Sequence, residues 1–297
     1  MILNASGCLD ALTAPDVARS LDGFVTKTVT PLPREGNRPV RIAETDVGML
    51  NSIGLANPGI DRFLDEVLGR LLEIGPPVWV SVGGFAAEEY ADLCARLDGT
   101  EAAVLELNLS CPNVAAPEDE ATAIVSAARA VTGKPLYAKL APGLPDLPAV
   151  ASAAAAAGAD GLSLVNTIRG LALDPETLRP RLGTGSGGLS GPALRPVALA
   201  AVHVAYRATG LPIVGMGGVE NGAHALELIA AGASAVALGT VLFSDPGAPA
   251  RVREELLVEA ARHDFESPSA ARGAADGAVA RTADAGSAEA GRVGLKL

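Results

Sequence analysis

Short apolar runs alternate with longer amphipathic stretches along most of this chain. Eight runs have the length of buried strands, and each ends in a polar or glycine-rich corner; they cover residues 2–5, 23–25, 78–82, 103–107, 136–138, 161–165, 212–214 and 235–238. Helical patterns separate them, at 15–21, 60–74, 87–97, 118–131, 147–157, 192–208, 223–231 and 248–263. Strand–helix alternation predicts a parallel sheet, and eight repeats of it predict a closed α/β barrel of the (β/α)8, or TIM, type.

The pattern predicts one domain followed by a tail. Residues 1–263 carry the eight repeats, whereas residues 264–297 are rich in alanine and glycine and show no apolar period, so we expect a disordered tail. Two connections are long, at 28–59 and 166–191. Both follow strands, so both are expected on the C-terminal face, where barrel enzymes hold their chemistry.

Composition narrows the class of protein. The apolar fraction is 49% and the net charge is -11, which argues against binding to nucleic acid or to anionic membrane surfaces. We find no secretory signal and no apolar run of membrane-spanning length. The three cysteines are an odd number without metal-ligand spacing, so we expect free thiols in the cytoplasm and no metal. The three histidines, 203, 224 and 263, fall in helical patterns.

Polar chemistry follows the fourth predicted strand, in the motif Glu-Leu-Asn-Leu-Ser-Cys-Pro-Asn at 106–113. Pro112 disfavours helical geometry at Cys111, so the thiol is expected on an extended or turning backbone. A thiol flanked by amides after a strand fits a reaction centre, but a buried cysteine in a turn fits this motif equally well. Cys8 is a weaker second candidate near the same end of the barrel. Cys94 lies within a helical pattern and is expected to serve packing.

The ends of other predicted strands carry lysines, asparagines and glycine-rich corners. Two of the four lysines, Lys27 and Lys139, end predicted strands, where a functional role competes with simple exposure to solvent. Glycine corners at 215–218 and 239–240 follow the last two strands and suit a phosphate, although glycines also form ordinary turns. Four asparagines could pair with the polar edge of a heterocycle, or could act only in turns and caps. They are Asn51, Asn108, Asn113 and Asn166.

A set of short motifs, spread from residue 4 to residue 240, matches one known family. They are Asn-Ala-Ser-Gly at 4–7, Thr-Lys-Thr at 26–28, Arg-Glu-Gly-Asn at 34–37, Asn-Ser-Ile-Gly-Leu-Ala-Asn-Pro-Gly at 51–59, the motif at 106–113, Lys-Leu at 139–140, Asn-Thr at 166–167, Gly-Gly-Leu-Ser-Gly-Pro at 187–192, Gly-Met-Gly-Gly at 215–218 and Gly-Thr at 239–240. With these motifs the chain resembles the class 1 dihydroorotate dehydrogenases.

The resemblance implies an FMN-dependent (β/α)8 barrel that oxidises (S)-dihydroorotate to orotate in pyrimidine biosynthesis. It implies that Cys111 is the base, that Lys27 touches substrate and flavin, and that Lys139 stabilises the negative charge of the reduced flavin. The implied substrate residues are Lys27, Asn51, Ser52, Ile53, Gly54, Leu55, Asn108, Asn113, Asn166 and Thr167. The implied cofactor residues are Ser6, Lys27, Thr28, Ser81, Asn108, Lys139, Val165, Gly191, Gly217, Gly218, Gly239 and Thr240. Ser81 stands where the family usually has an asparagine.

The resemblance also bears on partners. Within class 1, one group reduces fumarate as a homodimer, and another passes electrons to NAD through an iron–sulfur and FAD subunit. The stretches 187–192 and 215–218 look more like the second group, which implies an iron–sulfur and FAD electron-transfer subunit as a partner. We also expect a homodimer. Two alternatives remain open: a related FMN-dependent dihydropyrimidine oxidoreductase, and an inactive barrel acting as an assembly subunit.

Overall fold

The eight predicted strands form one parallel barrel sheet. The computed structural model describes residues 1–109 and 117–277. Its main sheet has the order β1-β12-β11-β8-β7-β6-β5-β2, and a parallel bridge between Leu3 and Gly23 links β1 to the residue before β2. The strands are β1 Ile2–Asn4, β2 Phe24–Val25, β5 Val78–Val82, β6 Val104–Asn108, β7 Leu136–Leu140, β8 Gly161–Leu164, β11 Ile213–Met216 and β12 Ala235–Leu238. The predicted (β/α)8 barrel is therefore confirmed.

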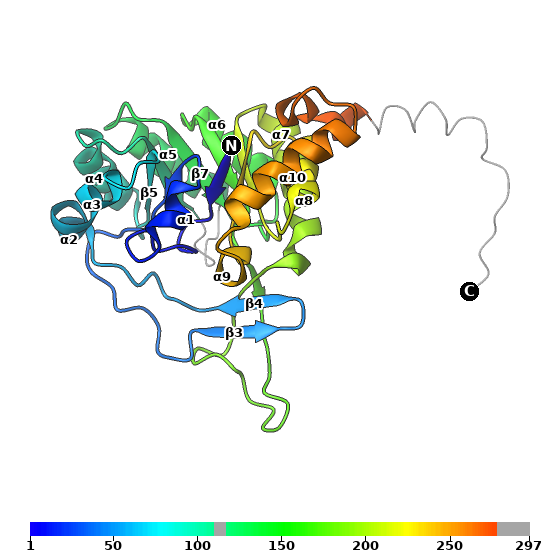
Figure 1. Ribbon diagram of the computed structural model, residues 1–297. Helices are drawn as coiled ribbons and strands as arrows, with labels where there is room; N and C mark the ends of the chain where they lie inside the picture. Colours follow the sequence, from blue (N-terminus) through cyan, green and yellow to red (C-terminus); the bar gives the residue numbers. More distant parts are fainter. Residues whose placement is uncertain (110–116, 278–297) are drawn as a thin grey trace.

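Helices cover the outside of the strand ring (Figure 1). They are α1 Pro15–Arg19, α2 Ile60–Arg62, α3 Gly69–Leu72, α4 Ala87–Asp98, α5 Pro117–Arg129, α6 Leu147–Ala156, α7 Arg195–Thr209, α8 Gly222–Ala230, α9 Val241–Ser244 and α10 Ala248–Arg262. A π-helical turn, Phe63–Leu68, joins α2 to α3, and a 3-10 turn, Pro192–Leu194, precedes α7. Within the described ranges, none of these helices is both long and apolar enough to cross a bilayer.

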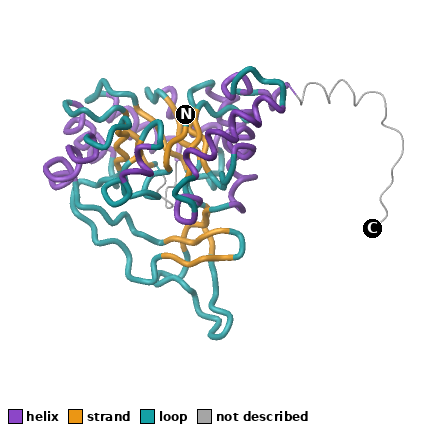
Figure 2. Tube along the Cα trace, in the orientation of Figure 1, coloured by secondary structure: helices purple, strands orange, loops and turns teal. Residues whose placement is uncertain are grey.

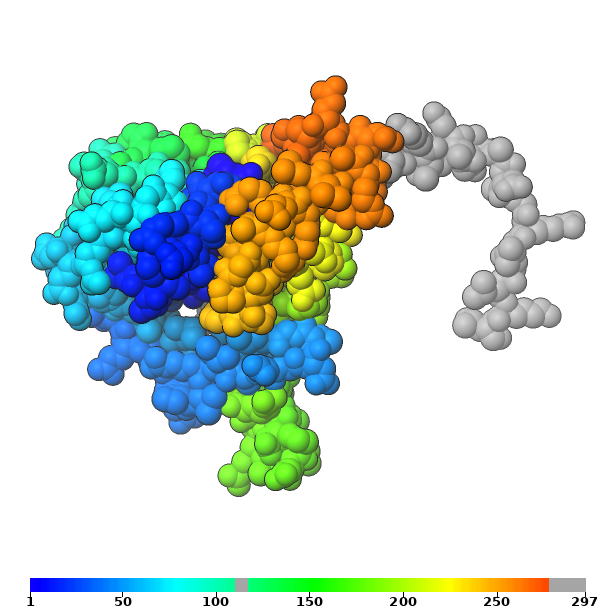
Figure 3. Space-filling view, viewed as in Figure 1, coloured from blue at the N-terminus to red at the C-terminus, as the bar shows by residue number. Residues whose placement is uncertain are grey.

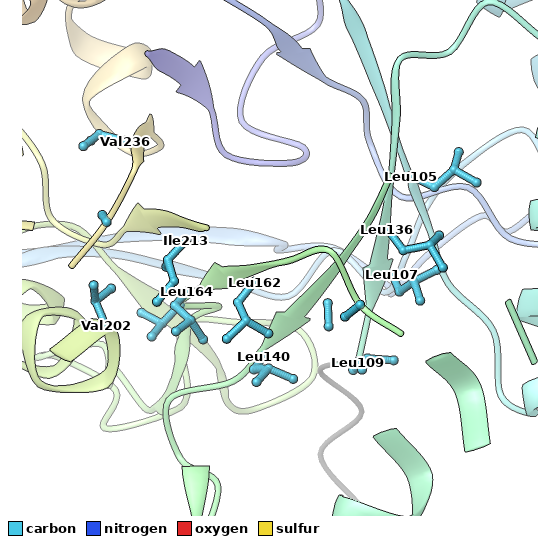
Figure 4. Close-up of a cluster of buried hydrophobic side chains, with 14 of the residues drawn as sticks. Leu105, Leu107, Leu109, Leu136, Leu140, Leu162, Leu164, Val202, Ile213 and Val236 are labelled. Carbon is cyan, nitrogen blue, oxygen red and sulfur yellow. The ribbon is translucent and has the colours of Figure 1, made fainter. Parts of the chain in front are cut away.

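The core has two layers because successive strand residues point to opposite faces. Outward-facing residues such as Leu105, Leu107 and Leu162 are fully buried between the strands and the helices (Figure 4). Inside the barrel lies a smaller apolar cluster that includes Trp79, whose ring centroid is 4.8 Å from that of Tyr137. Strands that are buried on both faces explain why the sequence showed continuous apolar runs.

The two long connections form a second, antiparallel sheet that the sequence did not predict. Its order is β3-β4-β10-β9, and it lies beside one end of the barrel (Figures 1 and 2). The strands are β3 Ile42–Thr45, β4 Gly48–Asn51, β9 Ile168–Gly170 and β10 Gly187–Ser190. Pairing of β4 with β10 joins segments more than a hundred residues apart, for example Asn51 with Gly188. In the space-filling view these segments form a separate layer next to the barrel (Figure 3).

Residues 264–277, which the sequence assigned to the tail, are folded onto the barrel. They contain a 3-10 turn, Pro268–Ala271. The Arg272 guanidinium donates to the carbonyl oxygens of Gly232 (2.9 Å) and Leu211 (2.8 Å), and its carbon lies 5.0 Å from the centre of the Tyr206 ring. An arginine on two carbonyls and an aromatic face anchors a segment without an apolar pattern. The remaining residues of the predicted tail lie outside the described ranges.

Candidate active site

A cavity of about 560 Å³ lies between the C-terminal ends of the barrel strands and the second sheet. This volume falls within the roughly 300–1,000 Å³ that is typical of ligand pockets. Most of the predicted site residues line it: Ser6, Lys27, Thr28, Asn51, Ser52, Ile53, Gly54, Leu55, Asn108, Lys139, Val165, Asn166, Thr167, Gly191, Gly217, Gly218, Gly239 and Thr240. Predicted residues from both long connections and from the ends of seven barrel strands thus meet at one cavity.

Two lysines bring positive charge to this cavity. Lys27 follows β2 and Lys139 belongs to β7, and the Lys139 side chain is only 7% exposed. Burial, followed by the positive charge of Lys139, lowers the pKa of Lys27 from 10.5 to about 8. The Lys139 ammonium lies 3.7 Å from Oε1 of Glu106, a buried carboxylate on β6. The cavity therefore favours anionic or electron-rich ligands.

A network of hydroxyls connects the first strands beneath the cavity. Thr28 Oγ1 lies 3.4 Å from Ser6 Oγ and 3.1 Å from Ser81 Oγ, and it accepts a hydrogen bond from Asn108 Nδ2 at 3.3 Å. Ser81 is fully buried and does not line the cavity, contrary to its predicted place against a cofactor. Its hydroxyl instead contacts Thr28 Oγ1 from the side away from the cavity. Ser81 can thus orient Thr28, while Ser6, Thr28 and Asn108 face the cavity.

Amide and loop residues form the opposite wall. Asn51 Nδ2 donates to the Gly188 carbonyl oxygen at 3.2 Å, which fixes the side chain at the edge of the second sheet. Asn166 Oδ1 accepts from the Thr167 N–H at 2.8 Å. In the loop after β4, Gly54 has φ +74°, and a Cβ there would lie 2.5 Å from the Asn37 side-chain oxygen. Donors and acceptors are thus held in place around the space for a planar heterocycle.

Bare backbone forms one end of the cavity. Gly191, Gly217 and Gly218 all have positive φ, at +99°, +129° and +72°. A Cβ on Gly218 would lie 2.8 Å from the Gly191 carbonyl oxygen, so only glycine fits there without a shift. Thr240 Oγ1 donates to Ser190 Oγ at 2.9 Å. Closely packed glycines beside a hydroxyl let backbone N–H groups approach an anion such as a phosphate.

The structure adds lining residues that the sequence did not single out, among them Asn37, Met49, Gly188, Ser190 and Phe243. Four of these belong to the second sheet or the loops beside it. Three of them, Asn37, Gly188 and Ser190, lie inside the matching motifs, but no local pattern predicted that they would line a cavity. Their position depends on pairing between distant segments, which local patterns do not reveal.

Of the three cysteines, only two lie in the described ranges. Cys8 lines the cavity, and burial raises the pKa of its thiol, so it does not ionise readily. Cys94 is buried in α4, and burial raises the pKa of its thiol to about 12, which agrees with a packing role. The predicted base Cys111 and the predicted substrate residue Asn113 lie outside the described residues.

Comparisons with known proteins agree with one another. A family model described as dihydroorotate dehydrogenase matches residues 1–259. The catalytic subunit of dihydroorotate dehydrogenase B (NAD(+)) from Desulforudis audaxviator is 48% identical over 244 residues, which cover 80% of each protein. A putative dihydroorotate dehydrogenase A (fumarate) from Solibacter usitatus is 44% identical over 245 residues, 80% of this chain and 81% of that protein. The crystal structure of DHODH from Eimeria tenella in complex with ferulenol aligns with a TM-score of 0.76 at 26% identity, covering 93% of this chain and 85% of that one.

Proposed function

The chain belongs to the dihydroorotate dehydrogenase family, and we propose that it oxidises (S)-dihydroorotate to orotate, a step of pyrimidine biosynthesis, in the cavity between barrel and second sheet. One observation carries this proposal. Two lysines, four asparagines and a glycine corner, drawn from segments far apart in the sequence, line the same cavity. This set suits a small anionic heterocycle beside a phosphate-bearing cofactor.

The residues present fit FMN. The glycine corner formed by Gly191, Gly217 and Gly218 leaves room that side chains would fill, and Gly239 and Thr240 lie beside it on the same cavity wall. We assign the phosphate to this corner and the ring system to the region of Ser6, Thr28 and Val165. Bound FMN supplies the acceptor for the hydride that leaves the dihydropyrimidine ring. Residues 217, 218, 239 and 240 follow the last two barrel strands, a frequent phosphate site in this fold.

The lysines serve different parts of the reaction. A Lys27 ammonium that loses its proton at about pH 8 is mostly charged at neutral pH, where it can pair with the substrate carboxylate. Lys139 brings a buried positive charge to the same cavity. We assign Lys139 to the flavin ring, where its charge favours the reduced form. Asn51, Asn108, Asn166 and Thr167 orient the substrate ring through hydrogen bonds.

Cys111 is our proposed base. Strand β6 brings Asn108 to the cavity, and Cys111 follows three residues later along the chain. The Cys111 thiolate would take the proton from the ring carbon next to the one that loses the hydride. Asn113 would contact the same ring. The hydride leaves with both electrons of its C–H bond, whereas the proton leaves without electrons. The electron pair of the C–H bond that loses the proton forms the C=C bond of the product.

We propose an electron-transfer subunit as the partner that reoxidises the flavin and passes its electrons to NAD. The support is the match to the catalytic subunit of a dihydroorotate dehydrogenase B (NAD(+)). The chain is nearly as similar to a putative fumarate-linked relative, so the acceptor needs its own test. Anaerobically reduced protein mixed with fumarate alone should stay bleached, whereas fast reoxidation by fumarate would contradict the assignment. We further propose a homodimer, which light scattering would test.

Substrate choice is tested on the holoenzyme without oxygen. Dihydroorotate should bleach the bound flavin, whereas dihydrouracil, which lacks the carboxylate, should leave it oxidised. A yellow protein that is bleached only by dihydrouracil would instead favour a dihydropyrimidine oxidoreductase. Purified protein without flavin, and without affinity for added FMN, would favour an inactive barrel.

A further inference from the structure

The inside of the barrel contains a buried carboxylate that the proposed reaction does not use. Glu106 lies on β6 between Leu105 and Leu107, which pack outward, so its side chain points into the barrel. It is 1% exposed, and the apolar residues Val104 and Trp79 belong to the same interior. Oε1 accepts no hydrogen bond from the described residues. A buried carboxylate is costly unless a positive charge lies near it.

Lys139 supplies that charge. Its ammonium is 3.7 Å from Glu106 Oε1, and no other ion pair within the described ranges involves either residue. Lys139 itself is nearly buried, with 7% of its side chain exposed, and it also lines the cavity. The positive charge of Lys139 acts on Lys27, whose pKa it helps to lower. Two ammonium groups near one another in a buried site repel, so Lys139 depends on a counter-charge.

The spacing of this pair determines what it can do. At 3.7 Å the two atoms attract as ions but lie beyond the roughly 2.7–3.2 Å of an N–H···O hydrogen bond. Glu106 therefore compensates the charge of Lys139 without occupying its N–H groups. Those groups stay available to a ligand in the cavity.

We propose that Glu106 is a positioning residue that keeps the charged Lys139 ammonium in the lining of the cavity. It thereby raises the reduction potential of the bound flavin. This inference rests on the proposed function, because it takes FMN to be the ligand beside Lys139. Without Glu106, the Lys139 ammonium would lose its counter-charge, and the side chain would move away from the bound flavin. The reduced flavin, which carries more negative charge, would then be less stable.

The test is a redox titration of the holoenzyme with the isosteric substitution Glu106→Gln. We expect the two-electron equilibrium between oxidised and reduced flavin to shift at least tenfold toward the oxidised form. This shift makes the reduction potential more negative by about 30 mV. Glu106→Asp keeps the negative charge, so its reduction potential should lie closer to that of the wild type. Ser163→Ala is the matched control. Ser163 is also buried inside the barrel, and its hydroxyl has no hydrogen-bond partner among the described residues, but it is uncharged, so its loss should leave the potential unchanged. An unchanged or more positive potential in Glu106→Gln would overturn the proposal.

A second variant keeps the proposal testable if Glu106→Gln does not give folded flavoprotein. The double variant Glu106→Gln/Lys139→Met removes both charges, so at saturating FMN it should resist urea better than Glu106→Gln alone. A double variant that is no more resistant would overturn the pairing. The two proposals fail in different ways. If the wild-type protein neither binds FMN nor is bleached by dihydroorotate, the proposed function itself is wrong. If the wild type does both and Glu106→Gln has an unchanged potential, only the role of Glu106 is wrong.

Discussion

The side-chain amide of Asn4 pairs with both backbone polar groups of Val25. Its Nδ2 donates to the Val25 carbonyl oxygen at 2.7 Å, and its Oδ1 accepts from the Val25 N–H at 2.8 Å. Asn4 ends β1 and is completely buried. It joins β1 to β2, which is only two residues long and is bridged to β1 at Leu3 and Gly23. A side chain therefore completes the closure of the barrel, next to the strand end that carries Lys27.

Replacing Asn4 should destabilise the barrel strongly. Asn4→Ala removes two buried hydrogen bonds and leaves the N–H and C=O groups of Val25 without these partners, a loss of about 2–4 kcal/mol in the free energy of unfolding. Asn221→Ala is the control, because Asn221 caps α8 by accepting from the His224 N–H, and loss of a cap costs about 1 kcal/mol. Urea unfolding of both variants measures the difference. Equal losses would contradict the closure role.

Arg272 should anchor the chain after α10. Arg272→Ala removes the hydrogen bonds to Gly232 and Leu211 and the contact with Tyr206, so we expect a loss of about 1–3 kcal/mol. Hydrogen exchange should accelerate in residues 264–277 and not in the barrel strands. Arg272→Lys keeps the charge but cannot make the same paired hydrogen bonds, so its stability should lie between those of the wild type and Arg272→Ala. Unchanged exchange in the segment would show that Arg272 does not anchor it.

Orotate binding should depend on pH through Lys27. Because its pKa is lowered to about 8, the ammonium is charged below that pH and neutral above it. The affinity of the holoenzyme for the orotate carboxylate should therefore fall between about pH 7 and about pH 9. Flavin absorbance during orotate titration reports binding. Lys27→Met should bind weakly at every pH in this range; an equally steep pH dependence in that variant would assign the effect to another group.

Gly218→Ala should weaken FMN binding. The residue has φ +72°, and the added Cβ would lie 2.8 Å from the Gly191 carbonyl oxygen, so the glycine corner must shift. We expect at least a tenfold loss of affinity, equivalent to about 1.4 kcal/mol. Gly210→Ala is matched in conformation, with φ +65°, but a Cβ there would lie more than 4 Å from every other atom that could obstruct it in residues 1–109 and 117–277. It should cost about 1 kcal/mol of stability and leave the FMN dissociation constant unchanged. Equal FMN affinity in both variants would contradict the phosphate assignment.

The sequence predicted the barrel well because its strands are buried on both faces and its helices alternate with them. The ends of those strands also pointed to Lys27, Lys139 and the glycine corners. The second sheet was missed because β10, Gly187–Ser190, is half glycine and because the alternation in β3 spans only four residues. Its existence depends on pairing such as Asn51 with Gly188. Glu106 was overlooked for a different reason: one carboxylate in an apolar run gives no sign of its partner, which lies on the next strand.

The central claim is that Cys111 removes a proton from dihydroorotate while the flavin takes up the hydride. Rapid anaerobic mixing of the holoenzyme with dihydroorotate, followed by flavin absorbance, tests it most directly. For Cys111→Ser at neutral pH we expect bound FMN and a bleaching rate lower by about 100-fold or more, because a serine hydroxyl is a much weaker base. Cys94→Ala, which changes a thiol outside the cavity, should match the wild type. A Cys111→Ser protein that bleaches at the wild-type rate would contradict the account.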